Sequence, residues 1–296
     1  MSTNFRDSAL APLVYCLVAY GLAFAVAVVT WRALPDADPL LRTFYADVAG
    51  TLVIFISGTI VRNSSMYDPY WSVGPIVIGA VWLSFAATGD EALRAWLALG
   101  LVALWGLRLT YNCFRRWTDM SHEDFRYQDF RAKWGRHYWF VDLFGIQLLP
   151  TTLVFLACLP LWPAMTIMEH PLGWLDILAV IVTLGAIIIE TVADENLQTF
   201  LKSDPPKGAV CKVGLWQYSR HPNYFGEIMF WWGLYLFALA IDPAWWWTGI
   251  GALAITLLFV FASVPMMEVR KREKRPDYDE QVKGISKIIP LPVRKG

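Results

Sequence analysis

The sequence predicts an all-α integral membrane protein, a single multi-span domain over residues 1–296 with seven or eight transmembrane helices. Apolar residues make up 56% of the chain and charged residues only 17%, whereas soluble domains average about 45–50% and about 25%. The mean hydropathy of +0.42 and the recurrence of long charge-free runs point the same way. Lys+Arg and Asp+Glu balance at 25 each, so no nucleic-acid partner is expected.

Each transmembrane helix is predicted from a charge-free run that approaches the ~20 residues needed to cross a bilayer. The first run continues without a small-residue cleavage site, so we interpret it as a span and not as a removable signal. Around Asp242 and Pro243, the runs form either two spans joined by a tight turn or one broken helix, because proline removes a helical hydrogen bond. In chain order the runs are 9–30, 48–61, 69–89, 95–107, 143–168, 177–189, 228–241 and 243–267.

The distribution of basic residues predicts the orientation of the chain. With eight spans and an inner amino terminus, every Lys and Arg lies on the inner side except Arg32, Arg42, Arg94 and Arg108, which fits the positive-inside rule. The alternative topology has seven spans and an outer amino terminus. It also places the later polar loops on the inner side. We therefore expect the polar loops, and any cofactor site that they form, to face the cytoplasm.

Cysteine and histidine residues follow no metal-binding or nucleophile pattern. The four Cys have no CxxC spacing and the four His lack ligand spacing, so neither a metal site nor a disulfide framework is expected. The sequence contains no GxGxxG, Walker or HExxH motif. Any chemistry must therefore use polar groups at the inner ends of the helices.

The most informative polar segment is 214–227, which runs directly into an apolar helix. Pro222 suits the first turn of that helix, and Arg220 and His221 beside a helix amino terminus would form an anion site. Asn223 and Glu227 are spaced i, i+4 and share one face. The alternative is a helix start with an interfacial Arg and a capping Asn, although an unpartnered Glu227 inside a membrane helix would be costly.

Two further polar pairs or stripes lie at the inner ends of helices. Glu190 and Asp194 are spaced i, i+4 after an apolar run, so both carboxylates can accept hydrogen bonds from ribose hydroxyls or from arginine. Arg108, Asn112 and Arg116 repeat every four residues on the fourth helix. The alternative is an interhelical salt bridge of the pair Glu190 and Asp194 with Arg108 or Arg116, and both interpretations can hold at once. Together these groups suit a large polar anionic cofactor with an apolar substrate that enters from lipid.

At this point the motifs resemble a known family. The sequence from about 60 to 295 is similar to the bacterial steroid 5α-reductase-like family, which is known as a domain of unknown function and is related to eukaryotic steroid and sterol reductases. Isoprenylcysteine carboxyl methyltransferases carry a similar Arg-His-Pro-x-Tyr core, so that core alone is not specific. The segments that carry the resemblance are YDPYWSVGP (67–75), RRW (115–117), HEDFRY (122–127), ETVAD (190–194), SRHPNYFGE (219–227) and PMMEVR (265–270).

The resemblance implies NADPH-dependent reduction of a carbon–carbon double bond conjugated to a ketone, as in 3-oxo-Δ4 steroid 5α-reduction, in a bacterial inner membrane. By position, Asn223 and Glu227 match residues that hold the nicotinamide carboxamide and the adjacent sugar. The other implied cofactor residues are Glu190, Asp194, Arg108, Asn112, Arg116 and Glu268, with Lys212, Tyr218 and His221 near the phosphate or adenine portion.

One departure from the family pattern concerns the proton donor. Eukaryotic steroid reductases carry a Gln-Glu pair on the second helix and a Tyr on the next helix to hold the substrate ketone, and this sequence has no Gln-Glu pair. Tyr67 and Asp68 are the ionisable groups in the link between helices two and three, so we predict that they are catalytic. The alternative is that either residue only caps the third helix beside Pro69.

Three classes of function remain open on the sequence alone. We favour the NADPH-dependent reductase, which acts on a steroid, a terpenoid or another hydrophobic enone and needs membrane lipids but no obligate protein partner. A membrane methyltransferase that uses S-adenosylmethionine is the alternative. A lipid-binding or transport protein without chemistry comes third, because the polar groups cluster at one end of the helices and transport requires them across the membrane midplane.

Overall fold

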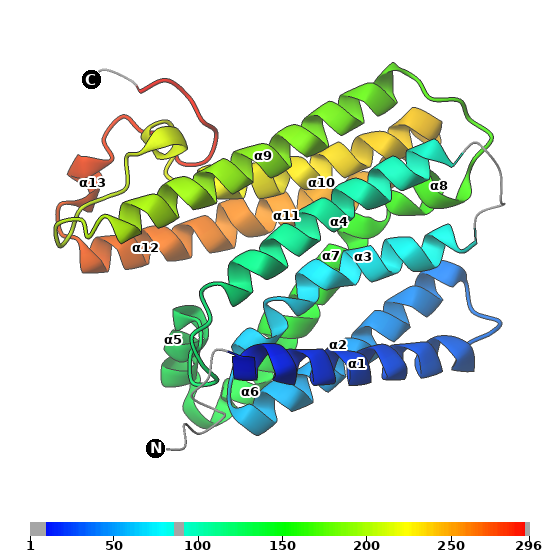
Figure 1. The fold of residues 1–296 in the computed structure, drawn as a ribbon, viewed down its shortest axis with the longest axis horizontal. Helices are drawn as coiled ribbons and strands as arrows, with labels where there is room; N and C mark the ends of the chain where they lie inside the picture. Colours follow the sequence, from blue (N-terminus) through cyan, green and yellow to red (C-terminus); the bar gives the residue numbers. More distant parts are fainter. Residues whose placement is uncertain (1–9, 86–91, 294–296) are drawn as a thin grey trace. The chain divides into compact units, whose positions relative to one another are not determined.

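The computed structural model describes residues 10–85 and 92–293 and confirms the predicted all-α architecture (Figure 1). Within these ranges the only strand-like pairing is an isolated parallel bridge between Ser219 and Ser286. The helices are α1 (Leu10–Ala33), α2 (Pro39–Val61), α3 (Tyr70–Leu83), α4 (Leu93–Phe114), α5 (Phe125–Trp134), α6 (Tyr138–Phe140), α7 (Leu149–Cys158), α8 (Leu161–Thr166), α9 (Trp174–Lys202), α10 (Pro222–Ile241), α11 (Ile250–Leu258), α12 (Val264–Lys274) and α13 (Tyr278–Gln281).

Seven helical stretches in the described part of the chain are long and apolar enough to cross a bilayer, so the chain is a multi-span membrane protein. Five of them are single helices, namely α1, α2, α4, α9 and α10. The other two are the composite stretches Phe125–Cys158 and Pro243–Lys274. The run 69–89 forms the shorter helix α3, whose 14 residues extend about 21 Å, and residues 86–91 lie outside the described part of this run.

The break at Asp242 separates two spans. α10 ends at Ile241, and Asp242 has an extended backbone (φ −156°, ψ 131°). The Asp242 carboxylate accepts a hydrogen bond from the backbone N–H of Ala244 at 2.7 Å, which caps the next stretch. Pro243 occupies the first turn of that stretch, where its missing N–H has no helical partner to lose. Of the two predicted alternatives, the structure therefore has two spans.

Both composite spans pass through a π-helical turn, at Val141–Leu148 and at Phe259–Ser263. Each turn ends two residues before a proline, Pro150 or Pro265. Within an α-helix, a proline lacks the N–H for a hydrogen bond, and its ring clashes with the carbonyl four residues earlier. The wider π turn relieves this clash, so both spans continue through their prolines.

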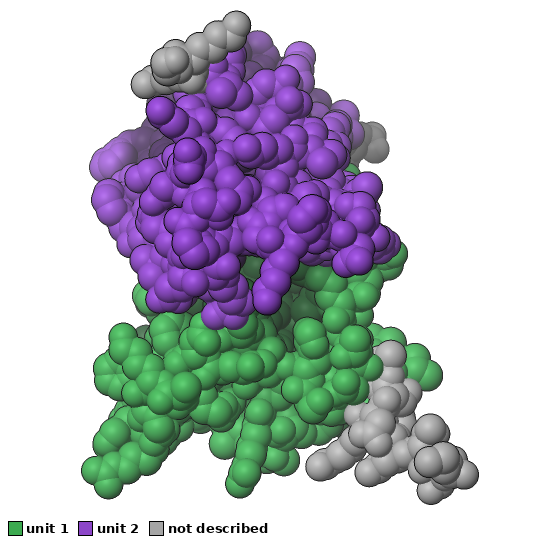
Figure 2. Space-filling view, turned by 90° about the vertical axis from the view of Figure 1, so that its left-hand side faces the viewer, with its two compact units in different colours: residues 1–84, 102–156 green, residues 85–101, 157–296 purple. Residues whose placement is uncertain are grey.

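The chain divides into two compact units (Figure 2). Unit 1 comprises residues 1–84 and 102–156, and unit 2 comprises residues 85–101 and 157–296. In unit 1, α1 and α2 lie side by side, and in unit 2, α9, α10 and α11 do so (Figure 1). Large side chains fill both interiors: Ile54, Met66 and Tyr67 are fully buried in unit 1, and Phe230, Trp231 and Phe237 are fully buried in unit 2.

Glycine residues allow α9 and α10 to approach closely. A Cβ atom added to Gly233 of α10 would lie 2.3 Å from the Thr183 hydroxyl of α9, and one added to Gly226 would lie 2.7 Å from the Glu190 Cβ. Both distances are too short for real contacts. The interface therefore depends on the absence of side chains at these two positions, and it places Glu190 directly against the first turns of α10.

Candidate functional site

The start of α10 is fixed by the carboxyl-terminal segment of the chain. Pro222 opens the helix as predicted. Just before it, the Arg220 N–H donates to the Ser286 carbonyl at 2.8 Å, and the Ser219 hydroxyl donates to the Ile288 carbonyl at 2.6 Å. These bonds join segments about 70 residues apart, so the polar loop before α10 has a defined conformation in unit 2.

Glu268 of α12 connects three neighbouring side chains. It is buried and accepts hydrogen bonds from Arg220 Nη1 (2.9 Å), His221 Nε2 (3.1 Å) and Tyr278 Oη (2.7 Å). Burial lowers the pKa of His221 below its ordinary value of 6.5, although the hydrogen bond to Glu268 opposes this shift. The predicted anion site at this helix start therefore has less positive charge than the sequence indicates, because Arg220 is ion-paired and His221 is neutral at pH 7.

Asn223 and Glu227 lie one turn apart on α10, beside α9. Glu227 is buried, and its Oε1 accepts a hydrogen bond from the Trp231 indole at 2.8 Å. The Asn223 Oδ1 is also buried, but it has no hydrogen-bond donor among the described residues. A buried acceptor without a donor is costly, so Asn223 is the clearest candidate here for a contact with a bound molecule.

The remaining predicted cofactor residues of unit 2 differ in burial. Glu190 is buried on α9 against Gly226, and Asp194 follows it at i+4 on the same helix, partly buried. Lys212 and Tyr218 are exposed on the loop between α9 and α10. This loop is held on α9 by the Trp216 indole, which donates to the Ala193 carbonyl at 2.8 Å.

Two of the three residues predicted for the fourth helix, Arg108 and Asn112, lie on the part of α4 that belongs to unit 1, whereas Arg116 lies in the turn after the helix ends at Phe114. Asn112 is buried, and its carbonyl accepts a hydrogen bond from Arg116 Nε at 3.0 Å. Arg108 is partly buried, one turn before Asn112. The predicted i, i+4 stripe is therefore helical only from Arg108 to Asn112, and its role in cofactor binding stays a prediction.

The two predicted catalytic residues lie side by side in sequence but have different partners. Tyr67 is buried, and its hydroxyl shares a hydrogen bond of 2.8 Å with the Thr151 hydroxyl. Asp68 accepts a hydrogen bond from the Tyr127 hydroxyl and lies 3.8 Å from Arg126. Burial raises the pKa of Asp68 from 3.8 to about 6 against the opposing charge of Arg126. Neither residue caps α3, which has no side-chain cap.

An apolar pocket of about 490 Å³ lies between α1, α2 and α3 in unit 1. Its volume is in the range of small-molecule sites, roughly 300–1,000 Å³. Two of its polar side chains bond each other, since the Tyr70 hydroxyl donates to Asp47 Oδ1 at 3.2 Å. Tyr20, Arg32, Thr43 and Ser84 also line the pocket. The other lining residues include Ala23, Phe24, Ala27, Val28, Val73, Val77, Ile78 and Val81.

The neighbouring residues of α2 hold this carboxyl–phenol pair in place. A Cβ at Gly50 would lie 2.5 Å from the Tyr70 hydroxyl, so the glycine leaves the space that the phenol occupies. Thr51, one turn after Asp47 on the same helix, shares a hydrogen bond of 2.9 Å with Thr151. Since Thr151 also bonds Tyr67, the predicted catalytic tyrosine is connected through two threonines to α2, the helix that carries Asp47.

The sequence reasoning missed Asp47 and Tyr70. The second span was predicted from 48, one residue after the acid, and the predicted donors were Tyr67 and Asp68. The signal was an acid within an otherwise apolar helix, since an ionisable residue at that depth is a functional candidate. A glycine three residues later, on the same helical face, was a second signal.

No solved structure matches the chain at a significant level. An uncharacterized protein of the fission yeast Schizosaccharomyces pombe is 26% identical over 278 residues, which cover 82% of this chain and 79% of the relative. The family model described as a protein of unknown function, DUF1295, matches residues 54–284. This match includes the polar segment after α2, the start of α10 and the Glu268 network, and the chain therefore belongs to the DUF1295 family.

Proposed function

We propose that this protein reduces the carbon–carbon double bond of a hydrophobic enone, such as a 3-oxo-Δ4 steroid, with NADPH as the reductant. The observation that carries this proposal is the hydrogen-bonded pair of Asp47 and Tyr70 in the wall of an apolar pocket. The pocket suits an apolar skeleton from the lipid, and the pair suits its single ketone. A carboxyl on the second helix and a tyrosine at the start of the next also correspond to the ketone-holding arrangement of the steroid reductases that the sequence resembles.

Reduction of an enone requires a hydrogen-bond donor at the ketone oxygen. Hydride adds to the β-carbon, negative charge develops on that oxygen, and a proton is then added at the α-carbon. The phenol of Tyr70 carries one O–H, and the carboxyl of Asp47 carries another when it is protonated. The pair can therefore donate to the ketone and keep the hydrogen bond between its two members.

Several residues of unit 2 suit a nicotinamide nucleotide. The Asn223 Oδ1 lacks a donor among the described residues, and the carboxamide NH₂ of nicotinamide would supply one. Glu190, Asp194 and Glu227 are acceptors that suit ribose hydroxyls. NADPH, when bound, supplies the hydride. Glu268 fixes Arg220 and His221, so it positions the helix start on which Asn223 and Glu227 lie.

We also propose that the cofactor residues face the cytoplasm of a bacterial inner membrane. The polar loops near residues 115–136 and 202–220 and the basic stretch after residue 270 are rich in Lys and Arg, and the loop 62–68 begins with Arg62. The positive-inside rule places such basic segments in the cytoplasm. NADPH is a soluble cofactor, so a site at this end of the helices is accessible to it.

The proposal is tested by separating turnover from cofactor binding in three variants. Tyr70→Phe and Asp47→Asn are expected to lower kcat about 100- to 1,000-fold, as loss of a transition-state donor does, with unchanged NADPH affinity. Asn223→Ala is expected to weaken NADPH binding about 5- to 150-fold. Tyr45→Phe changes an exposed tyrosine of the same helix as Asp47 and serves as the control.

Other outcomes would exclude this assignment. Normal rates in both Tyr70→Phe and Asp47→Asn would show that the pair takes no part in the reaction. Tyr67 and Asp68 would then again be the candidate proton donors. If substrate conversion requires S-adenosylmethionine and proceeds without NADPH, the methyltransferase alternative replaces the reductase.

A further inference from the structure

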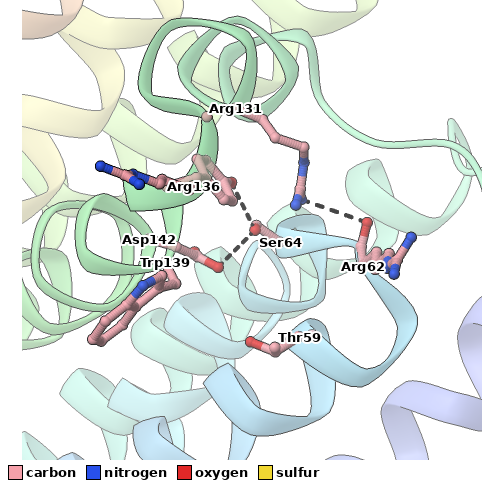
Figure 3. Close-up of a pocket in the computed structure, with 10 residues that line it drawn as sticks. Thr59, Arg62, Ser64, Arg131, Arg136, Trp139 and Asp142 are labelled. Atoms are coloured by element: carbon pink, nitrogen blue, oxygen red, sulfur yellow. Dashed lines mark hydrogen bonds between the residues drawn. The ribbon is translucent and has the colours of Figure 1, made fainter.

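A second cavity, of about 530 Å³, lies in unit 1 beside the carboxyl end of α2 (Figure 3). Three arginines line it, Arg62 from the end of α2 and Arg131 and Arg136 from α5 and the turn that follows it. Ser64 and Asp142 lie between them, and the Ser64 hydroxyl donates to Asp142 Oδ2 at 2.9 Å. This cavity shares none of its lining residues with the apolar pocket of Asp47 and Tyr70.

The depth of the cavity relative to the bilayer follows from the helices that form it. The apolar span α2 ends at Val61, immediately before Arg62. In the composite span Phe125–Cys158, the last basic side chains of the first part include Arg136, and the residues from Tyr138 onward are mostly apolar. Both helices therefore change from apolar to basic at the cavity, which is where the headgroup region of a membrane begins.

Aromatic side chains beside the cavity support the same depth. Trp139, which lines the cavity, and its neighbour Phe140 are each 47% exposed, and their rings stack 3.6 Å apart. Trp134, at the end of α5, is also exposed. Exposed aromatic rings of this kind are typical of the membrane–water interface, which is the depth that the change from apolar to basic residues also indicates.

The charge of the cavity is positive. Arg131 is ion-paired with Glu123 at 2.8 Å and lies over the Tyr138 ring. The Asp142 carboxylate already accepts hydrogen bonds from Ser64 and Gln147. Arg136 makes one side-chain hydrogen bond, to His137. Among the described residues the Arg62 guanidinium has no hydrogen-bond or ion-pair partner, so Arg62 and Arg136 keep donors for an anion.

The backbone of Arg62 gives a second, independent indication. Arg62 ends α2 in the left-handed conformation, with φ 58° and ψ 43°. Glycine adopts this conformation without strain, and a side chain there costs free energy. A cap alone would favour glycine, so the arginine at this position indicates a use for its guanidinium group.

We propose that this cavity binds the phosphate group of a membrane phospholipid, held by Arg62 and Arg136 with Arg131 behind them. Arginine is the residue best suited to phosphate, because its planar guanidinium donates two parallel hydrogen bonds. The phosphate of a lipid lies at the depth where the two helices become basic, and its acyl chains would extend beside Trp139 and Phe140. This site lies outside the proposed reductase function and does not depend on it.

The test is calorimetric titration of the detergent-solubilised full chain with dihexanoyl phosphatidic acid, compared with dihexanoylglycerol and with inorganic phosphate. We expect binding of the phosphatidic acid and none of the uncharged glycerolipid. Arg62→Gly and Arg136→Gln are each expected to weaken binding about 10- to 100-fold, as loss of a charged hydrogen bond does. Arg62→Gly should keep or raise the melting temperature, because it relieves the left-handed backbone strain.

Lys133→Gln is the matched control, since Lys133 is an exposed cation of α5 that does not line the cavity. Equal binding of phosphatidic acid by the wild type, Arg62→Gly and Arg136→Gln would overturn the proposal. Equal binding of the uncharged glycerolipid would also overturn it. Binding of inorganic phosphate as tight as that of phosphatidic acid would assign the cavity to a soluble phosphate compound and would likewise contradict a lipid site.

Discussion

Asp47 lies inside a membrane helix, where an acidic residue costs about 2.5–3.5 kcal/mol at the helix centre. Its hydrogen bond with Tyr70 offsets part of this cost. The pair is nevertheless placed at an apolar cavity and not between two packed helices. A purely structural pair would be better satisfied in a closed interface, so its position favours a role in binding a polar group on an apolar molecule.

At the residue scale, Asp68 predicts a dependence of stability on pH. Its pKa is about 6 in the folded protein and about 3.9 in an unfolded chain, so the folded state holds a proton more tightly than the unfolded state. The contribution of Asp68 to stability should therefore fall as the pH rises from about 4 to about 6 and change no further above that range. Asp68→Asn removes this titration.

The measurement is the melting temperature of wild type and Asp68→Asn in detergent between pH 4.5 and 7.5. We expect the melting temperature of Asp68→Asn to rise relative to that of the wild type as the pH increases. Asp36→Asn, which changes an exposed acid between α1 and α2, is the control. The difference in melting temperature between this variant and the wild type should not change with pH. A constant difference between Asp68→Asn and wild type over this range would contradict the assignment.

Individual polar residues could be chosen from the sequence, but their partners could not. Glu227 was selected because a carboxylate in a membrane helix needs a partner, and Glu268 was selected through the family resemblance. Both are buried in the structure. The Trp231 indole that bonds Glu227 was not predicted. Neither was Thr151, which lies 84 positions from Tyr67. Such contacts depend on how distant helices meet, which hydrophobic periodicity does not encode.

At the element scale, the contact between α9 and α10 predicts opposite effects for two Gly→Ala substitutions. A Cβ at Gly233 would lie 2.3 Å from the Thr183 hydroxyl and 2.8 Å from its backbone nitrogen, so Gly233→Ala should destabilise the protein by about 1–3 kcal/mol through overpacking. Gly185 of α9 has no atom within 4 Å of its Cβ position. Gly185→Ala should be stabilising by about 0.4–1 kcal/mol.

These two substitutions are compared by SDS-induced unfolding of the purified protein. They make the same chemical change in neighbouring membrane helices, so a general effect of alanine on helix stability would move both in one direction. Equal stability of Gly233→Ala and wild type would show that the two helices are farther apart than described here.

The elements themselves were predicted well where apolar runs are long and less well where charges interrupt them. The run 9–30 corresponds closely to α1 (Leu10–Ala33). The second span begins at Pro39, nine residues before the predicted start, because Asp47 was taken as the limit of the run although it lies within the helix. The π turns before Pro150 and Pro265 had no sequence signal beyond the prolines.

At the scale of the whole molecule, the composition is sufficient to predict an all-α membrane protein, and the seven candidate spans confirm it. The chain's division into two compact units was not predicted. It arises because contacts are concentrated within each unit, as in the glycine-mediated approach of α9 and α10 and the hydrogen bonds between the segments near Ser64 and Glu123. The family model covers most of both units.

The central claim is that the chain uses NADPH to saturate a hydrophobic enone, and one measurement tests it most directly. The purified full chain in lipid nanodiscs is incubated with NADPH and a 3-oxo-Δ4 steroid, and both NADPH absorbance and product mass are followed. The account predicts equimolar loss of NADPH and a product that has gained two hydrogen atoms, with no requirement for S-adenosylmethionine. A methylated product that forms only with S-adenosylmethionine, or a chain that binds no NADPH and leaves such enones unchanged, would contradict it.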